Sequence, residues 1–113
     1  MDITGFRDRI EAELRQLAEA STDAKESRAP VALDQQSVGR LSRMDAMQVQ
    51  AMAAETERRR QSRMEALRAA LKRIESQEFG FCTQCGEEIT EKRLDLDPAV
   101  AICIDCAPGR RRP

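Results

Sequence analysis

The sequence predicts a mainly α protein: an antiparallel coiled-coil helical hairpin followed by a small C-terminal ribbon around four cysteines. Two stretches with apolar residues at intervals of three and four predict the helices. Two CxxC pairs close to the C-terminus predict the ribbon. We therefore expect residues 1–78 to form the hairpin, residues 79–107 the ribbon and residues 108–113 a basic tail.

The first predicted helix covers about 25 residues from the start of the chain. Its apolar stripe consists of Ile3, Phe6, Ile10, Leu14 and Leu17. This spacing places all five side chains on one face of a helix with 3.6 residues per turn. Such a face needs a partner helix, because it cannot be buried alone.

The second predicted helix runs from about Leu41 to Gln77. Its stripe has heptad-like spacing and consists of Ala53, Met64, Leu67, Leu71 and Ile74. The stripe is weaker in the middle, where Glu57 and Arg60 occupy stripe positions. Pro30 and Gly39 lie between the two helices, so we expect a turn there and an antiparallel pairing, with the tip of the hairpin at about residues 29–45.

Composition limits the size of the core and the kinds of partner. The chain has 113 residues, of which 35% are charged and three are aromatic, so it cannot bury a large apolar core. The net charge is -1, which does not suit a general polycation for nucleic acid or anionic lipid. No apolar run is long enough for a membrane span, and the acidic N-terminus does not resemble a signal peptide. We therefore expect a cytoplasmic protein without a membrane partner.

The cysteines follow the pattern C-x2-C-x17-C-x2-C and are Cys82, Cys85, Cys103 and Cys106. In a reducing compartment this spacing favours a tetrahedral site for one Zn²⁺ per chain. Four thiolates leave no open position for water, so the expected site is structural and not catalytic. Two local disulfides and a thioredoxin-like redox pair are the alternatives, although no βαβ pattern surrounds the pairs.

The residues between the two cysteine pairs predict a very small core. The alternation of Val100, Ile102 and Ile104 predicts a short strand before the second pair, and Pro98 prevents a long helix before it. We expect metal binding to supply much of the folding free energy of the ribbon.

Several features argue against an enzyme. The sequence contains no histidine, no phosphate-binding GxxxxGK[ST] motif and no glycine-rich dinucleotide fingerprint. A helical hairpin with a small metal-bound ribbon also offers no large cleft for a small-molecule substrate. We therefore expect a protein that acts by binding to a partner.

The segments FGFCTQCGEEI, KRL and AICIDC closely resemble the zinc ribbon of the DksA/TraR family of bacterial transcription factors. The order of hairpin and ribbon is also similar to that family. The resemblance implies a protein that binds RNA polymerase, inserts its coiled coil into the secondary channel and modulates transcription initiation. It implies no catalysis and no sequence-specific DNA binding.

The family carries a DxxDxA motif at the tip of the coiled coil, and this chain departs from it. Asp34 matches the first acid, whereas Ser37 and Gly39 replace the second acid and the alanine. Asp45 is another carboxylate expected near the tip. By resemblance, these four residues are the candidate partner-binding residues of the tip. The structural alternative for Asp34 is an ordinary role as a helix N-cap, and both roles are compatible.

Well-known members of the family also bind guanosine tetraphosphate through a basic residue of the second helix and a lysine after the last zinc cysteine. The matching positions here are Ala66 and Ala107. We therefore expect no guanosine tetraphosphate site on this chain.

Two other classes of function stay open at this point. A nucleic-acid-binding zinc ribbon is supported only by the basic tail at Arg110, Arg111 and Arg112. A thiol redox sensor that releases zinc on oxidation is compatible with four clustered thiolates. Binding to core RNA polymerase, as against salt-dependent binding to DNA, separates the first two classes.

Overall fold

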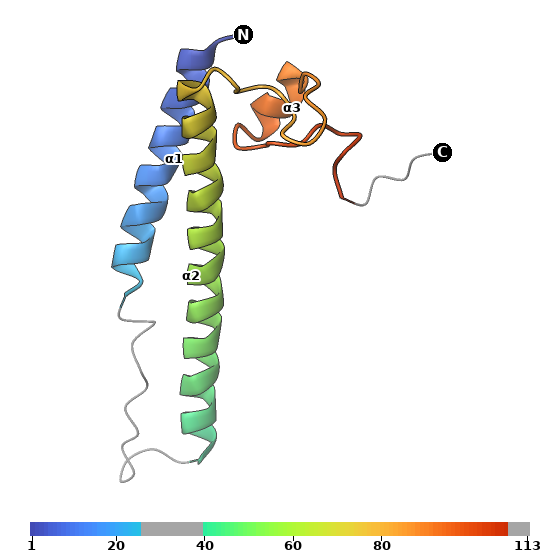
Figure 1. Cartoon of the computed structure of the whole chain (residues 1–113). Helices are drawn as coiled ribbons and strands as arrows, with labels where there is room; N and C mark the ends of the chain where they lie inside the picture. Colours follow the sequence, from blue (N-terminus) through green and yellow to red (C-terminus); the bar gives the residue numbers. More distant parts are fainter. Residues whose placement is uncertain (26–39, 109–113) are drawn as a thin grey trace. The chain divides into compact units, whose positions relative to one another are not determined.

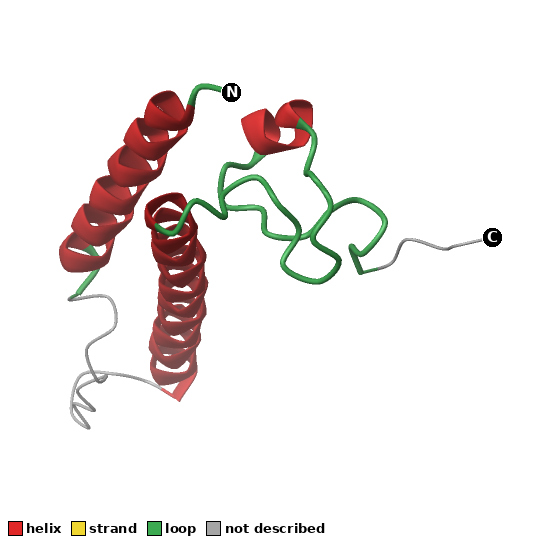
Figure 2. Ribbon diagram, turned by 45° about the horizontal axis from the view of Figure 1, so that its top comes forward, coloured by secondary structure: helices red, strands yellow, loops and turns green. Residues whose placement is uncertain are grey.

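The computed structural model describes residues 1–25 and 40–108. Its elements are α1 (Ile3–Asp23), α2 (Arg40–Glu75) and α3 (Glu91–Leu96), which are labelled in Figure 1. The predicted fold class, a helical hairpin with a small C-terminal ribbon, is confirmed. Apart from α3, the ribbon consists of loops and turns, as Figure 2 shows in green. Within the described ranges, no helix has the length and apolar character needed to cross a membrane.

The chain divides into two compact units. The first unit comprises Met1–Arg15 and Met64–Pro113, and the second comprises Gln16–Arg63. The first unit therefore contains the start of α1, the end of α2 and the whole described ribbon. The second unit contains the end of α1 and the first part of α2.

The apolar core lies in the first unit. Its buried residues are Phe6, Ile10, Met64, Leu67, Ala70, Phe79, Cys82, Ile89, Leu94, Ala99 and Cys103. The largest fully buried side chains are Ile10 of α1, Leu67 of α2 and Leu94 of α3, so each helix supplies one. Phe6 and Phe79 add an aromatic contact, with ring centroids 5.5 Å apart. The helices and the ribbon thus share one core, which suits a chain with few aromatic residues.

The second unit has a different interior. None of its residues with a described side chain, 16–25 and 43–63, is fully buried. The Ser21 hydroxyl of α1 donates a hydrogen bond of 2.6 Å to the Glu57 carboxylate of α2. The weakness of the predicted stripe at Glu57 and Arg60 therefore corresponds to a polar contact between the two helices.

Both long helices have identifiable ends. At the start of α1, the Asp2 carboxylate accepts a hydrogen bond of 3.0 Å from the backbone N–H of Gly5, which is typical of an N-cap. At the end of α2, the N–H of Glu78 donates to the Arg73 carbonyl at 2.7 Å, and the N–H of Gln77 donates to the Ile74 carbonyl at 3.2 Å. These two bonds form a Schellman motif, which needs a left-handed residue at its centre.

Gln77 is that residue, with a φ of 62°, and glycine adopts this conformation without a steric penalty. We expect Gln77→Gly to raise the free energy of unfolding by about 0.5–1 kcal/mol. Glu75→Gly, inside the last turn of α2, is the matched control and should lower it by about 0.5–1 kcal/mol. Thermal or urea unfolding of the zinc-loaded protein measures both. A loss of stability in Gln77→Gly would contradict the assignment of the motif.

The ribbon corrects one prediction and adds one element. The predicted strand through Val100, Ile102 and Ile104 is wrong: the only pairing of strand type in the described residues is an isolated antiparallel bridge between Phe81 and Glu88. The Val100 N–H turns back to the Asp97 carbonyl at 3.0 Å, so the segment cannot form a ladder there.

Helix α3 was not predicted. Thr90 caps its start by accepting a hydrogen bond from the backbone N–H of Arg93. One of the free backbone N–H groups of the first turn is thereby satisfied, as is typical of an N-cap. The helix ends at Leu96, two residues before Pro98, in agreement with the expected limit on helix length. Leu94, its buried residue, connects α3 to the shared core.

Candidate metal centre

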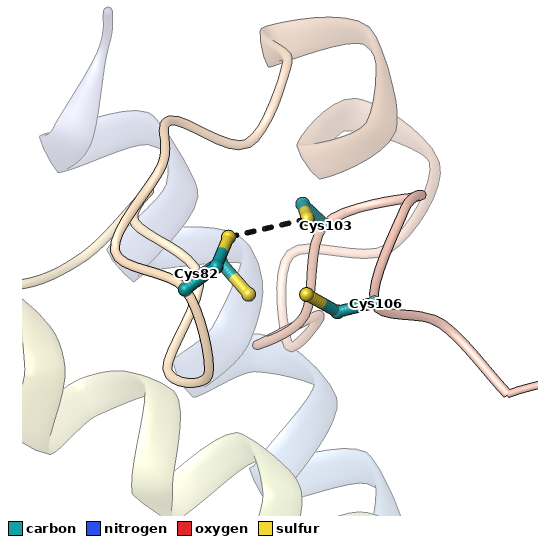
Figure 3. Close-up of side chains that lie close together, drawn as sticks. Cys82, Cys103 and Cys106 are labelled. Atoms are coloured by element: carbon teal, nitrogen blue, oxygen red, sulfur yellow. Dashed lines mark hydrogen bonds between the residues drawn. The ribbon is translucent and has the colours of Figure 1, made fainter. Parts of the chain in front are cut away.

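Two tight turns bring the four cysteines together. The first holds Cys82 and Cys85, and the second holds Cys103 and Cys106. One sulfur from each residue lies within 4.8 Å of the other three. Figure 3 shows Cys82, Cys103 and Cys106 with their sulfurs directed toward a common point. The candidate metal ligands predicted from the sequence are therefore adjacent in space.

Backbone hydrogen bonds shape the two turns. The N–H of Gly86 donates to the Cys82 carbonyl at 2.9 Å, and the N–H of Cys106 donates to the Cys103 carbonyl at 3.1 Å. Gly86 has a φ of 77°, which explains the glycine directly after the first pair. A bond of 2.9 Å from the Thr83 N–H to the Ala101 carbonyl joins the segments that carry the two pairs.

The spacing of the sulfurs fits a metal ion and not disulfides. All four cysteines are free thiols, and the Cys85 and Cys103 sulfurs are 3.6 Å apart. A tetrahedron with Zn–S bonds of about 2.3 Å has S–S edges of about 3.8 Å, close to this separation. The Gln84 N–H also lies 3.4 Å from the Cys82 sulfur, where it can donate to a thiolate. The donor set and its geometry therefore suit Zn²⁺.

The thiols perturb one another's pKa because they are so close. A hydrogen bond from the Cys103 backbone lowers the pKa of Cys82 to about 6, against the opposing effect of burial. Hydrogen bonding to the Cys103 thiol and burial raise the pKa of Cys106 to about 12. A hydrogen bond from the Glu87 backbone lowers the pKa of Cys85, but burial and the Cys103 and Cys82 thiols outweigh it, so this pKa is raised. Four thiolates at this spacing need a cation to offset their charge.

Arginine side chains attach the ribbon to its surroundings within the first unit. Arg93 donates to the Ile102 carbonyl at 3.1 Å, one residue before Cys103. Arg73 of α2 donates to the Ala99 carbonyl at 3.4 Å, and burial lowers the pKa of this arginine. Arg9 of α1 donates to the Asp95 carbonyl at 2.8 Å. None of these three hydrogen bonds was predicted from the sequence, because a single arginine on a polar helix face does not indicate a long-range contact.

The structure describes only one of the four candidate residues of the tip. Asp34, Ser37 and Gly39 lie outside the described residues, as do the arginines of the tail. Asp45 lies in α2 and is exposed. The two alanines at the expected nucleotide positions lie on α2 and directly after Cys106, and both are half-buried.

Comparison with known proteins agrees with this site. Residues 77–112 match the family described as prokaryotic dksA/traR C4-type zinc finger. The C-terminal third of the chain is therefore similar to the DksA/TraR C4-type zinc finger. With this match and the clustered thiols, the ribbon is a structural zinc site, for which one Zn²⁺ per chain supplies the cross-link.

The chain is similar in this region to curated proteins named RNA polymerase-binding transcription factor DksA. The protein from Haemophilus influenzae is 44% identical over 43 residues, which are 38% of this chain and 30% of that protein. The protein from Escherichia coli strain K12 is 47% identical over 36 residues, 32% of this chain and 24% of that protein. The sequence match thus spans less than a third of the length of either relative.

The fold comparison extends further along the chain. The structure of transcription factor DksA2 from Pseudomonas aeruginosa matches with a TM-score of 0.73 and 19% sequence identity. The match covers 90% of this chain and 77% of that protein. The hairpin and ribbon therefore share their fold with DksA2, although the sequence similarity is concentrated in the ribbon.

Proposed function

We propose that this protein is an RNA polymerase-binding regulator of transcription initiation, present in the cytoplasm, that acts without catalysis of its own. The observation that carries the proposal is the ribbon, whose sequence is similar to that of RNA polymerase-binding factors. The fold match to DksA2 supports the same reading over most of the chain. The coiled coil would enter the secondary channel of the polymerase, as the resemblance implies.

In this proposal Cys82, Cys85, Cys103 and Cys106 are the four zinc ligands. The ion would hold the two turns together and would not take part in a reaction, because a site with four thiolates has no open position. Bound zinc would supply folding free energy. The four thiolates would bind the ion, and backbone N–H groups would donate hydrogen bonds to the sulfurs. The role of the ribbon would then be to present a fixed surface at the base of the hairpin.

The hairpin tip would act on the polymerase through its carboxylates, Asp34 and Asp45, with Ser37 and Gly39 as further candidate contact residues. Asp45 is exposed, as contact with a partner requires. The same part of α2 exposes Met44, Met47, Val49 and Met52, with 54–71% of each residue accessible. Flexible methionines adapt well to a protein partner, which supports a contact surface along this segment.

Capture of purified core RNA polymerase tests the proposal. The tagged protein should retain the polymerase, and a second factor known to occupy the secondary channel should displace it. A sequence-independent DNA interaction that weakens steeply with salt, without any polymerase binding, would instead favour the nucleic-acid-binding zinc ribbon. The zinc-loaded full chain is needed, because the first unit includes both the ribbon and the base of the hairpin.

We also expect guanosine tetraphosphate to have little effect through this protein. Ala66 and Ala107 supply no cation, so the nucleotide would lack the charge-assisted hydrogen bonds that hold phosphate groups. The test is to measure the effect of this protein on transcription with and without guanosine tetraphosphate. The polymerase used should lack its own separate nucleotide site. The regulator's effect should change by less than about twofold, which is below 0.5 kcal/mol in binding terms. Strong synergy in that assay would contradict the prediction.

A further inference from the structure

The Glu57 carboxylate is the centre of a polar cluster between α1 and α2 in the second unit. It accepts from the Ser21 hydroxyl at 2.6 Å, from the Gln61 amide at 2.7 Å and from the Arg60 guanidinium at 3.1 Å. We call these four residues the Glu57 cluster. Ser21 comes from α1 and the other three come from α2, so the cluster joins the two helices.

Burial distinguishes this cluster from ordinary surface ion pairs. The side chains of Arg60 and Glu57 are 21% and 16% exposed. On the same helix, the pair of Arg59 with Glu55 leaves side chains that are 80% and 44% exposed. A carboxylate that is largely removed from water and holds three donors contributes more than an exposed pair, and removal of a donor leaves it less well compensated.

The Glu57 cluster lies in the unit that has little apolar burial. The fully buried apolar side chains of the described chain belong to the first unit, and the second unit has none at the positions whose side chains are described. Apolar burial is the main driving force for pairing amphipathic helices. Where it is small, a polar contact between the helices carries a larger share of the pairing free energy.

The contact also depends on the alignment of the helices. A hydroxyl can donate to a carboxylate only within about 3 Å, whereas displacement by one helical turn moves a residue by about 5.4 Å. Ser21 therefore meets Glu57 in one register of the pair. Polar groups at core positions of helical coiled coils fix register in this way.

We propose that the Glu57 cluster closes and aligns α1 and α2 in the second unit, and that this unit opens as a separate step from the zinc-containing first unit. Ser21 and Glu57 are positioning residues in this device. Opening separates the Ser21 hydroxyl from the carboxylate and exposes the backbone of both helices there. The core around Leu67 and the zinc ribbon stay closed during that step.

Amide hydrogen exchange measured by mass spectrometry on the zinc-loaded full chain tests the proposal. In Ser21→Ala, peptides from residues 16–25 and 50–61 should exchange roughly three- to tenfold faster, as expected for the net loss of one partly exposed hydrogen bond. Peptides from residues 79–106 should keep their rates. Glu57→Gln should give the same pattern, because a neutral amide accepts these hydrogen bonds less strongly.

The chain provides matched controls for both substitutions. Thr22→Ala removes a hydroxyl whose hydrogen bond among the described residues lies within its own helix, to the Ala18 carbonyl at 3.1 Å. Glu55→Gln removes a carboxylate that pairs with Arg58 and Arg59 on the exposed side of α2. Neither control should change exchange in residues 16–25 by more than about twofold.

Two results would overturn the proposal. One is equal exchange rates in Ser21→Ala and Thr22→Ala over residues 16–25. The other is an equal acceleration in the ribbon peptides, since the two units would then open together. If Glu57→Gln proves too unstable to compare, Ser21→Ala still decides the matter, because alanine keeps or raises helix propensity at that position.

Discussion

Replacement of one zinc ligand, Cys103→Ser, should remove the metal and unfold the ribbon. The purified parent is expected to contain one zinc per chain, and the variant close to none by atomic emission. A structural zinc site with four thiolates contributes on the order of 10 kcal/mol of apparent binding free energy, and a serine hydroxyl is a poor substitute for a thiolate. Most of the helical circular dichroism should remain, because α1 and α2 keep their own contacts around Ile10 and Leu67.

The core shared by the ribbon and the hairpin predicts which residues should respond to the loss of zinc. Phe79 and Leu94 of the ribbon belong to the same core as Phe6 and Leu67 of the hairpin. Loss of zinc should therefore speed amide exchange first in residues 79–106 and then in residues 1–15 and 64–75. Glu87→Gln, an exposed carboxylate beside the site, is the control and should keep its zinc. A zinc-free variant with the stability and exchange rates of the parent would contradict a structural role for the metal.

The two long helices were predictable because their signals are periodic and local. Stripes at three- and four-residue spacing placed both helices close to their observed bounds, and Ile10 and Leu67 were on the predicted faces. The four cysteines were equally accessible to prediction, since their spacing reflects the geometry of two metal-binding turns. The division of the chain at residue 78 stays a prediction.

The ribbon interior was harder to predict because its shape depends on long-range contacts. Val100, Ile102 and Ile104 alternate like a strand, yet this segment follows a turn at Asp97 and has no partner strand in the described residues. Six residues of α3 are too few to produce a periodic signal, so its Thr90 cap was the only local indication. Hydrogen bonds from Arg73 to Ala99 and from Arg93 to Ile102 have no sequence signature at all.

The polar contact in the middle of α2 could be predicted only in part from the sequence. In the sequence, Glu57 and Arg60 interrupt the apolar stripe. The interruption does not reveal which residues form hydrogen bonds with these polar side chains. The partner, Ser21, comes from the other helix, 36 residues away along the chain. Only the three-dimensional pairing shows that the polar positions meet in one cluster.

Replacement of the tip carboxylates should separate binding from regulation in the proposed function. We expect Asp34→Asn and Asp45→Asn, together, to keep affinity for RNA polymerase within about fivefold, since one solvated charge contact typically contributes about 0.5 kcal/mol and two contribute about 1 kcal/mol. The change in promoter-complex lifetime or transcript yield caused by the protein should fall by most of its size. The physical reason is that the arm and ribbon supply docking area, whereas carboxylates at the tip can act on mobile elements or on the magnesium field of the active centre.

Asparagine is the informative replacement, because it keeps the size of the side chain and also caps helix starts, so a loss of activity would not come from a lost cap. Asp8→Asn, an exposed carboxylate of the first unit, is the matched control and should regulate like the parent. Binding is measured by competition for core polymerase, and regulation by promoter-complex decay at saturating protein. If the double variant binds and regulates as the parent does, the tip charge is not the effector, and the protein would act by occupying the channel through bulk alone.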